Sequence, residues 1–92
     1  MDPKIENQDY VKPLNEVSFD LSDGRKCLVK AGTGRDMIKA SQVCKQDPDR
    51  LMFAMIAQVT TIDGNPIMME DLEDMNLKDV MEIQANFSNV NF

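Results

Sequence analysis

The sequence predicts an α+β fold in which one N-terminal β-hairpin is followed by three or four packed α-helices. Three observations lead to this prediction. Apolar and polar residues alternate on both sides of Asp23-Gly24, as they do in a two-stranded ribbon. Apolar residues then recur at helical spacing, and Asp47-Pro48 and Asp63-Gly64-Asn65-Pro66 interrupt them. A chain of 92 residues has room for one domain.

Residues 1–15 differ in composition from the remainder of the chain. They are mostly polar, they contain Pro3 and Pro13, and their apolar residues follow no period. So few apolar side chains cannot offset the conformational entropy that is lost on ordering. We therefore expect a flexible arm over residues 1–15 and a single folded domain over residues 16–90.

The predicted hairpin has a register that its side chains specify. A three-residue loop over residues 22–24, with its glycine in a left-handed conformation, places Phe19 opposite Cys27. The same register sets Asp20 opposite Lys26, which is a favourable cross-strand pair. The residues expected on the inward face are Val17, Phe19, Leu21, Cys27, Val29 and Ala31.

Capping residues mark two helix starts. Thr33 and Asp36 form the Thr-x-x-acid pattern that begins a helix, and Asp47 followed by Pro48 begins a second one. The second helix, from Pro48 to about Thr61, is apolar on nearly all sides. Such a helix either lies at the centre of the core or is partly covered by a partner. The apolar stripe expected on the first helix consists of Met37, Ile38, Ala40, Ser41, Val43 and Cys44.

The residue pattern in the last third of the chain predicts a turn and two further helices. Residues 63–66 form the turn, because glycine frees the backbone and proline excludes helix. A short helix is expected over residues 69–75, and Asn76 caps a final helix. Residues 86–92 have low helix propensity and are expected to fray. The face predicted to pack on that final helix consists of Leu77, Val80, Met81, Gln84 and Phe87.

Charge and composition exclude several classes of partner. The net charge of −6 disfavours binding to nucleic-acid phosphates or to an anionic membrane surface. The longest apolar stretch, residues 51–62, is interrupted by polar side chains and is shorter than the roughly 20 residues of a membrane helix. Because the first residues do not resemble a signal peptide, we expect a cytoplasmic protein in which Cys27 and Cys44 are free thiols.

The sequence lacks the combinations of residues on which catalysis usually depends. The sequence contains no histidine, so Ser/His and Cys/His pairs are unavailable. A calcium-binding loop placed on Gly64 and Glu70 would require Val59 as a ligand, and Gly32-Thr33-Gly34-Arg35 lacks the ending of a phosphate-binding loop. The acidic residues at 70–74 are expected to form a solvated helix face. The sequence therefore predicts a protein that is not an enzyme and has no metal or cofactor.

Two features indicate that the chain binds other proteins. The first is methionine, at internal positions 37, 52, 55, 68, 69, 75 and 81. Methionine is flexible and polarizable and suits surfaces that bind varied apolar targets, although it also fills gaps in small cores. The second is the apolar second helix, on which Met52, Phe53, Met55 and Ile56 are the predicted partner-binding residues. The same helix could also support homo-oligomer formation.

Several short motifs, taken together and in order, resemble one family. They are the run from Val17 to Val29, Thr33-Gly34-Arg35-Asp36-Met37, the apolar residues 51–56, the run from Thr60 to Ile67, and Glu70-Asp71-Leu72. These motifs are similar to the tail assembly chaperones of Mu-like prophages and related contractile-tailed phages. The resemblance covers roughly residues 13–90. Its most specific part is the Asp-Gly-Arg turn followed by Thr-Gly-Arg-Asp.

The resemblance implies a protein of the host bacterial cytoplasm that acts in virion morphogenesis. Such a chaperone coats the phage tape measure protein, keeps it soluble, and helps the tail tube protein assemble around it. Arg35 has the least obvious structural role in its motif, and we expect it to contact the partner or to form a salt bridge. Two alternatives remain: a small acidic phage regulatory or inhibitory protein that binds a host protein, and a minor structural protein of the virion.

Overall fold

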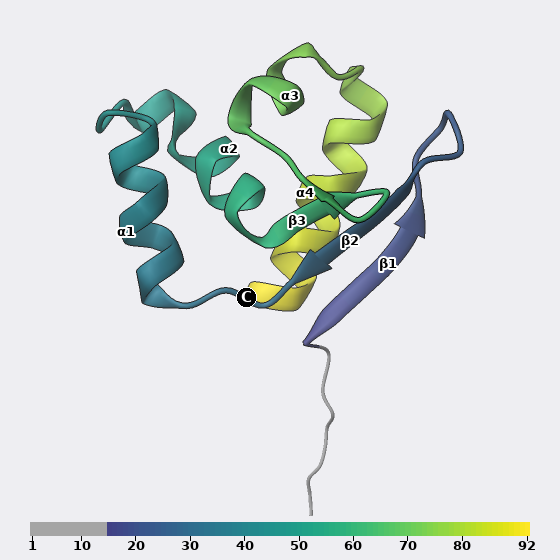
Figure 1. Ribbon diagram of the computed structural model, residues 1–92, viewed down its shortest axis with the longest axis horizontal. Coiled ribbons are helices and arrows are strands. Elements are labelled where there is room, and N and C mark those ends of the chain that lie inside the picture. Colours follow the sequence, from purple (N-terminus) through teal and green to yellow (C-terminus); the bar gives the residue numbers. More distant parts are fainter. Residues whose placement is uncertain (1–14) are drawn as a thin grey trace, which may run out of the picture.

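A four-stranded antiparallel sheet and four helices make up the fold of the computed structural model, which describes residues 15–92. The α+β class is therefore confirmed, and nearly all of the predicted arm lies outside the described residues. The strands follow the sheet order β1-β2-β3-β4 (Figure 1). In chain order the elements are β1 (Glu16–Asp20), β2 (Lys26–Lys30), α1 (Gly34–Val43), α2 (Pro48–Val59), β3 (Thr60–Ile62), β4 (Asn65–Pro66), α3 (Met69–Asp74) and α4 (Leu77–Asn91).

The register of the β1–β2 hairpin is the predicted one. Phe19 lies opposite Cys27 and Asp20 opposite Lys26, whose Nζ atom is 2.7 Å from the Asp20 carboxylate. The loop over residues 22–24 has the expected left-handed glycine, with φ of 92° at Gly24. Cross-strand pairing and turn geometry thus agree on one alignment. Ala31 lies beyond the strand and is exposed, so its predicted inward position is wrong.

The sheet continues into two strands that the sequence did not reveal. The second helix ends at Val59 instead of near Thr61, and Thr60–Ile62 form β3, which pairs with β2. The turn after β3 has φ of 52° at Asp63 and 81° at Gly64, so the chain reverses tightly into β4. Three consecutive β-branched residues favour the extended conformation over helix once a neighbouring strand is present.

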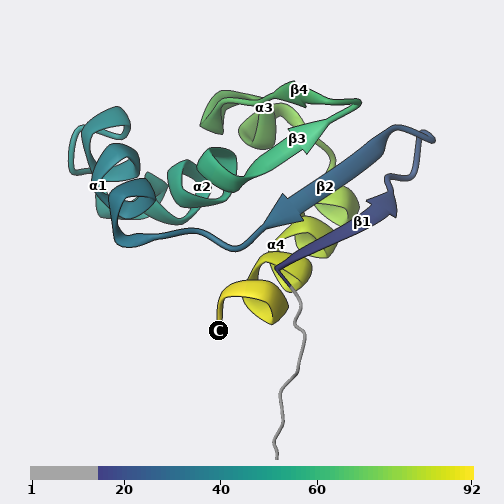
Figure 2. The same ribbon diagram turned by 60° about the horizontal axis from the view of Figure 1, so that its bottom comes forward.

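One face of the sheet is covered by α4, which runs along β1 and β2 (Figures 1 and 2). Buried strand residues such as Cys27 and Val29 pack in one cluster with Ile83 and Phe87 of this helix. Burying these side chains removes apolar area from water and is the main favourable contribution to folding. The buried members of this cluster are Leu21, Cys27, Val29, Ile56, Ala57, Val59, Ile62, Leu72, Ile83 and Phe87.

Helix α2 lies between α1 and the sheet (Figure 1). Ile56 faces the main cluster, while Ala54 joins Ala40, Cys44 and Met69 in a second one. This central position explains why α2 is apolar on nearly all sides, and it favours the first of the two alternatives stated for this helix.

The predicted caps begin their helices. The Asp47 carboxylate accepts a hydrogen bond from the Asp49 amide at 3.0 Å, and the Asn76 side chain accepts one from the Asp79 amide at 2.9 Å. At the start of α1, the Asp36 carboxylate accepts the Thr33 amide at 2.9 Å. Each contact satisfies a backbone donor that the helix ladder leaves free.

Asp79 is a buried carboxylate that joins the hairpin turn to the start of α4. It is 1% exposed, and its Oδ1 atom accepts the Ser22 amide at 2.9 Å. Its Oδ2 atom accepts the Ser22 hydroxyl at 2.8 Å and the Asn76 side-chain amide at 3.0 Å. These hydrogen bonds, above all that of the Ser22 amide, hold the pKa of Asp79 below its ordinary value.

Two predicted helix faces differ from the observed ones. In α1, Met37, Ile38 and Val43 are each about half exposed instead of packing with Ala40 and Cys44. In α4, the same correction applies to Leu77 and Met81, which are 74% and 57% exposed, while the unpredicted Ile83 is fully buried. Apolar residues occupy more than one side of each of these helices, so the sequence alone does not determine which side packs against the core.

Candidate protein-binding groove

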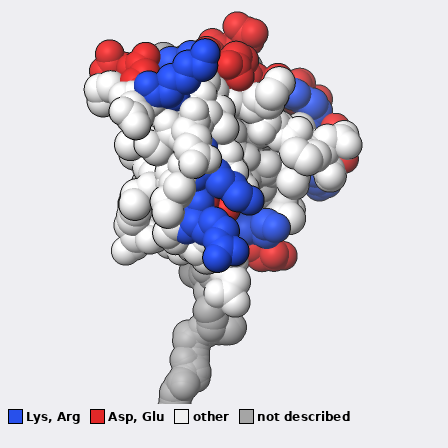
Figure 3. All heavy atoms as spheres, turned by 60° about the vertical axis from the view of Figure 1, so that its left-hand side comes forward, with Lys and Arg blue, Asp and Glu red and all other residues white. Residues whose placement is uncertain are grey.

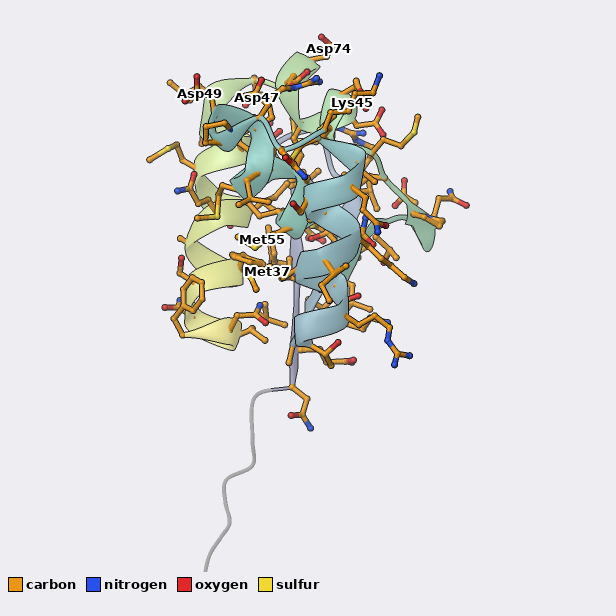
Figure 4. The ribbon with its side chains drawn as sticks, turned by 90° about the vertical axis from the view of Figure 1, so that its left-hand side faces the viewer. Met37, Lys45, Asp47, Asp49, Met55 and Asp74 are labelled. Carbon is orange, nitrogen blue, oxygen red and sulfur yellow. The ribbon has the colours of Figure 1, made fainter. Side chains whose placement is uncertain are left out.

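An apolar groove opens between the start of α1 and the end of α4. Its volume is about 220 Å³, and Met55 and Val59 of α2 form its floor. Figure 4 shows Met37 and Met55 close together between the two helices. The apolar side chains that line the groove are Met37, Met55, Val59, Phe87 and Phe92.

One asparagine fixes the geometry of this groove. The Asn91 side chain accepts a hydrogen bond from the Gly32 amide at 2.7 Å and donates to the Lys30 carbonyl at 3.3 Å. It also donates to the Phe87 carbonyl at 3.1 Å, and Phe92 packs edge-to-face on Phe87. The end of α4 is thus tied to the chain between β2 and α1. Fraying over residues 86–92 was predicted, and these contacts are the reason that the helix instead continues to Asn91.

The rim of the groove carries little available charge. Asp36 has the one acidic or basic side chain among the described residues that line it. That carboxylate is already engaged by the amide and the hydroxyl of Thr33, at 2.9 and 3.4 Å. Figure 3 shows charged side chains along the upper and right-hand edges of this side of the molecule and a central patch that is mainly Lys and Arg, with uncharged atoms over much of the remaining surface. The groove is therefore suited to an apolar ligand.

The residues predicted to bind a partner lie in different environments in the structure. Met55 lines the groove, and Met52, one turn earlier on the same side of α2, is 36% exposed. Phe53 is half-buried against both core clusters. Ile56 is only 1% exposed because it packs in the core. It therefore cannot contact a partner as predicted. Arg35 is exposed and forms no ion pair with residues 15–92.

Met37, Phe87 and Phe92 belong to the groove but were not predicted as binding residues. Met37 was assigned to the packed face of its helix, and Phe92 to a fraying end. Helical periodicity gave no signal for either role, because the groove is formed by residues of α1, α2 and α4 that lie far apart in the sequence.

Gly32 provides a direct test of how tightly the groove is built. A Cβ atom at this position would lie 2.9 Å from a Val59 methyl group and 3.3 Å from the Asp36 carboxylate. We expect Gly32→Ala to lower the free energy of unfolding by about 1–3 kcal/mol, as overpacking does. Gly34→Ala is the matched control, because a Cβ there meets nothing within 4 Å. Urea denaturation of both variants measures the effect, and equal stability would contradict this account of Gly32.

Acidic residues gather at the end of the molecule that lies away from the last turn of α4. Figure 4 shows Asp47, Asp49 and Asp74 there together with Lys45. Arg50 neutralises part of this end, since its guanidinium lies 2.7 Å from Glu73 and 3.4 Å from Glu70. The Arg50 hydrogen bond lowers the pKa of Glu73. Exposed pairs of this kind contribute little to stability.

A second, more polar pocket of about 420 Å³ lies between the β3–β4 hairpin and α3. Two of its carboxylates have structural roles: Asp63 accepts the Lys26 amide at 3.0 Å, and Asp71 accepts the Met68 amide at 2.8 Å. Within residues 15–92, no group of three or more Asp, Glu, Cys or His side chains is arranged to hold a metal ion. Arg25 and Asp74 are the other charged side chains that line this pocket.

The two thiols are buried in separate clusters. Cys27 is fully buried in the main cluster, Cys44 is 3% exposed in the second, and both are free. Burial raises the pKa of the Cys27 thiol to about 11, so it carries almost no thiolate at neutral pH. Neither cysteine is placed to act as a nucleophile.

Comparison with known proteins gives no match: no family model, curated protein or solved structure is similar to this chain at a significant level. No helix within residues 15–92 is long and apolar enough to cross a membrane. The groove between α1 and α4 is the feature of the described chain from which a function can be argued.

Proposed function

We propose that this chain is a tail assembly chaperone of a contractile-tailed phage or prophage. It binds apolar helical segments of the tape measure protein and keeps them soluble while the tail tube protein assembles. The observation that carries the proposal is the largely apolar, methionine-lined groove between α1 and α4. The motif resemblance over residues 13–90 supports the choice of this client.

The chemistry of the groove fits a client with varied apolar side chains. Flexible thioethers can adapt to ligands of different shape, and two of them, those of Met37 and Met55, line this groove. An amphipathic helix docks by placing apolar residues into such a groove. Among the described residues, the one side-chain carboxylate that lines the groove, that of Asp36, is already hydrogen-bonded to Thr33, so binding selects for apolar surface and not for one sequence.

The structure revises the set of proposed contact residues. Met52, Met55 and the half-buried Phe53 remain, Met37 is added, and Ile56 is removed because it is in the core. Arg35 stays in the set, at the exposed first turn of α1.

Coexpression tests the proposal directly. We expect the tape measure protein to be soluble with the wild-type chain and to precipitate with Met37→Glu, which places a charge in the apolar groove. Met68→Glu is the matched control, because Met68 is 66% exposed and lies outside the groove. A tape measure protein that is equally soluble without this chain would rule out the proposal.

The acidic end supports a second candidate, a small regulatory or inhibitory protein that binds a basic surface of a host protein. Asp47, Asp49 and Asp74 would then make the contact. Such binding weakens strongly as salt is added, whereas binding in the apolar groove does not. Salt dependence of partner binding therefore separates the two candidates, and finding the chain in purified virions would instead favour a structural role.

A further inference from the structure

The outer side of helix α1 combines basic and apolar residues on a chain that is acidic as a whole. Arg35, Ile38, Lys39 and Gln42 are all exposed, and the exposed fraction of Ile38 is 59%. These positions follow the i, i+3, i+4, i+7 spacing of one side of a helix. They are called the α1 outer face below.

Helix α1 is packed on one side only. Its contacts with other described elements are concentrated on α2, and Ala40 is its one buried residue. Figures 1 and 2 show α1 at the outside of the molecule, with α2 between it and the sheet. The α1 outer face is turned away from Ala40, so a partner can reach it without any rearrangement of the fold.

The cations of this face have no acidic partner among the described residues. Neither Arg35 nor Lys39 forms an ion pair with residues 15–92, whereas the cations of the β1–β2 hairpin do. The one acidic residue of α1, Asp36, is already hydrogen-bonded to Thr33. Figure 3, which brings the side of α1 forward, shows a central patch composed mainly of Lys and Arg. This side therefore offers positive charge on a chain of net charge −6.

Arg35 occupies a position that helix electrostatics disfavours. It lies in the first turn of α1, where free amide groups carry partial positive charge, and cations stabilise a helix at its opposite end. A carboxylate that approaches this turn meets the positive end of the helix and the Arg35 guanidinium together. The residue thus weakens the isolated helix slightly and becomes favourable when an acidic partner is bound.

The combination of charge and apolar surface selects a protein helix as the occupant, in preference to a nucleic acid or a membrane. Arg35 and Lys39 neutralise few phosphates, and an extended anionic surface repels a chain of net charge −6. A phosphate backbone also leaves Ile38 without an apolar contact. An amphipathic helix with acidic residues beside its apolar stripe provides both kinds of contact at helical spacing.

We propose that the α1 outer face binds an acidic amphipathic helix of a partner protein. An apolar residue of that helix packs on Ile38, and its carboxylates pair with Arg35 and Lys39. The contact is smaller than a standard interface, so we expect a dissociation constant on the order of 10–100 micromolar at low salt. The proposal does not depend on the chaperone function, because it uses no residue that lines the groove.

Fluorescence anisotropy with a labelled peptide tests the contribution of charge. The probe is a peptide of about 18 residues with leucine at every third or fourth position and glutamate on both sides of that stripe. Arg35→Glu and Lys39→Glu should each raise its dissociation constant at least about fivefold, because attraction becomes repulsion. Lys78→Glu is the matched control, since it changes the net charge equally at an exposed site of α4. It should raise the constant by no more than about twofold.

Ile38→Gln tests the apolar contribution, with Leu77→Gln as its control. Leu77 is 74% exposed but lies on α4, so only Ile38→Gln should weaken peptide binding, by about threefold or more. Glutamine keeps the helix propensity high in both variants. Far-UV circular dichroism confirms that each variant is folded.

Several results would overturn the proposal. One is a wild-type chain that does not bind the acidic peptide, and another is equal binding by Lys39→Glu and Lys78→Glu. Tighter binding of a labelled DNA duplex, or of vesicles that contain anionic lipid, would assign the face to a different occupant. Self-association of the chain that Lys39→Glu abolishes would likewise identify a second copy as the occupant.

Discussion

Replacing Ile83 with alanine is expected to lower the free energy of unfolding by about 2–5 kcal/mol. Ile83 is fully buried between α4 and the sheet, in the cluster that also holds Cys27 and Val29. The substitution removes buried methyl and methylene groups and leaves a cavity, which a small core can only partly close. For a chain of this size, such a loss is a large fraction of the total stability.

Met81→Ala on the same helix is the matched control. Met81 is 57% exposed, so its truncation should change the stability by no more than about 0.5 kcal/mol. Urea denaturation followed by circular dichroism gives both values, and an unchanged slope of stability against urea would show that the unfolded state is unaffected. Similar losses in the two variants would mean that the observed orientation of α4 is wrong.

Replacing Asp79 with asparagine is expected to lower the melting temperature at neutral pH by roughly 5 °C or more. Both carboxylate oxygens accept hydrogen bonds, one from the Ser22 amide and the other from the Ser22 hydroxyl and Asn76. Asparagine can present one acceptor oxygen only, so its amide group must face a donor. Because the site is 1% exposed, water cannot replace the lost hydrogen bond.

The difference between the wild type and Asp79→Asn should depend on pH. The Ser22 amide and the other donors hold the pKa of Asp79 below its ordinary value of 3.8. A carboxyl group whose pKa is lower in the folded state adds stability above its unfolded pKa and loses that contribution as the pH falls through the folded pKa. The difference in melting temperature should therefore be largest at about pH 7 and should shrink as the pH falls below the ordinary value.

Thermal unfolding of both proteins across this pH range measures the effect. Glu73→Gln serves as the control, because the pKa of Glu73 is also lowered, by Arg50, yet the pair is exposed to solvent. Its melting temperature should change by no more than about 2 °C. A difference for Asp79→Asn that stays constant down to acidic pH would show that the charge of Asp79 does not stabilise the fold.

The sequence by itself determined the local features of this protein. Hairpin register followed from cross-strand pairs such as Asp20 with Lys26, and helix starts followed from the caps Asp47 and Asn76. These features depend on residues that are close in the chain or joined by a short turn, so their side chains alone determine the geometry. For the candidate site, the sequence indicated Met52 and Met55 on the right helix but could not separate them from the buried Ile56.

Only the tertiary structure decided what depends on distant partners. Thr60–Ile62 form a strand because β2 offers free backbone groups, and the end of α4 is ordered because Asn91 reaches Gly32 and Lys30. The position of α1 beside the end of α4 likewise decided that Met37 lines a groove, and the packing of α4 on the sheet left Leu77 and Met81 exposed. An apolar side chain loses the same contact with water whichever neighbour covers it. The sequence therefore predicts that such a side chain is buried, but it does not predict which neighbour covers it.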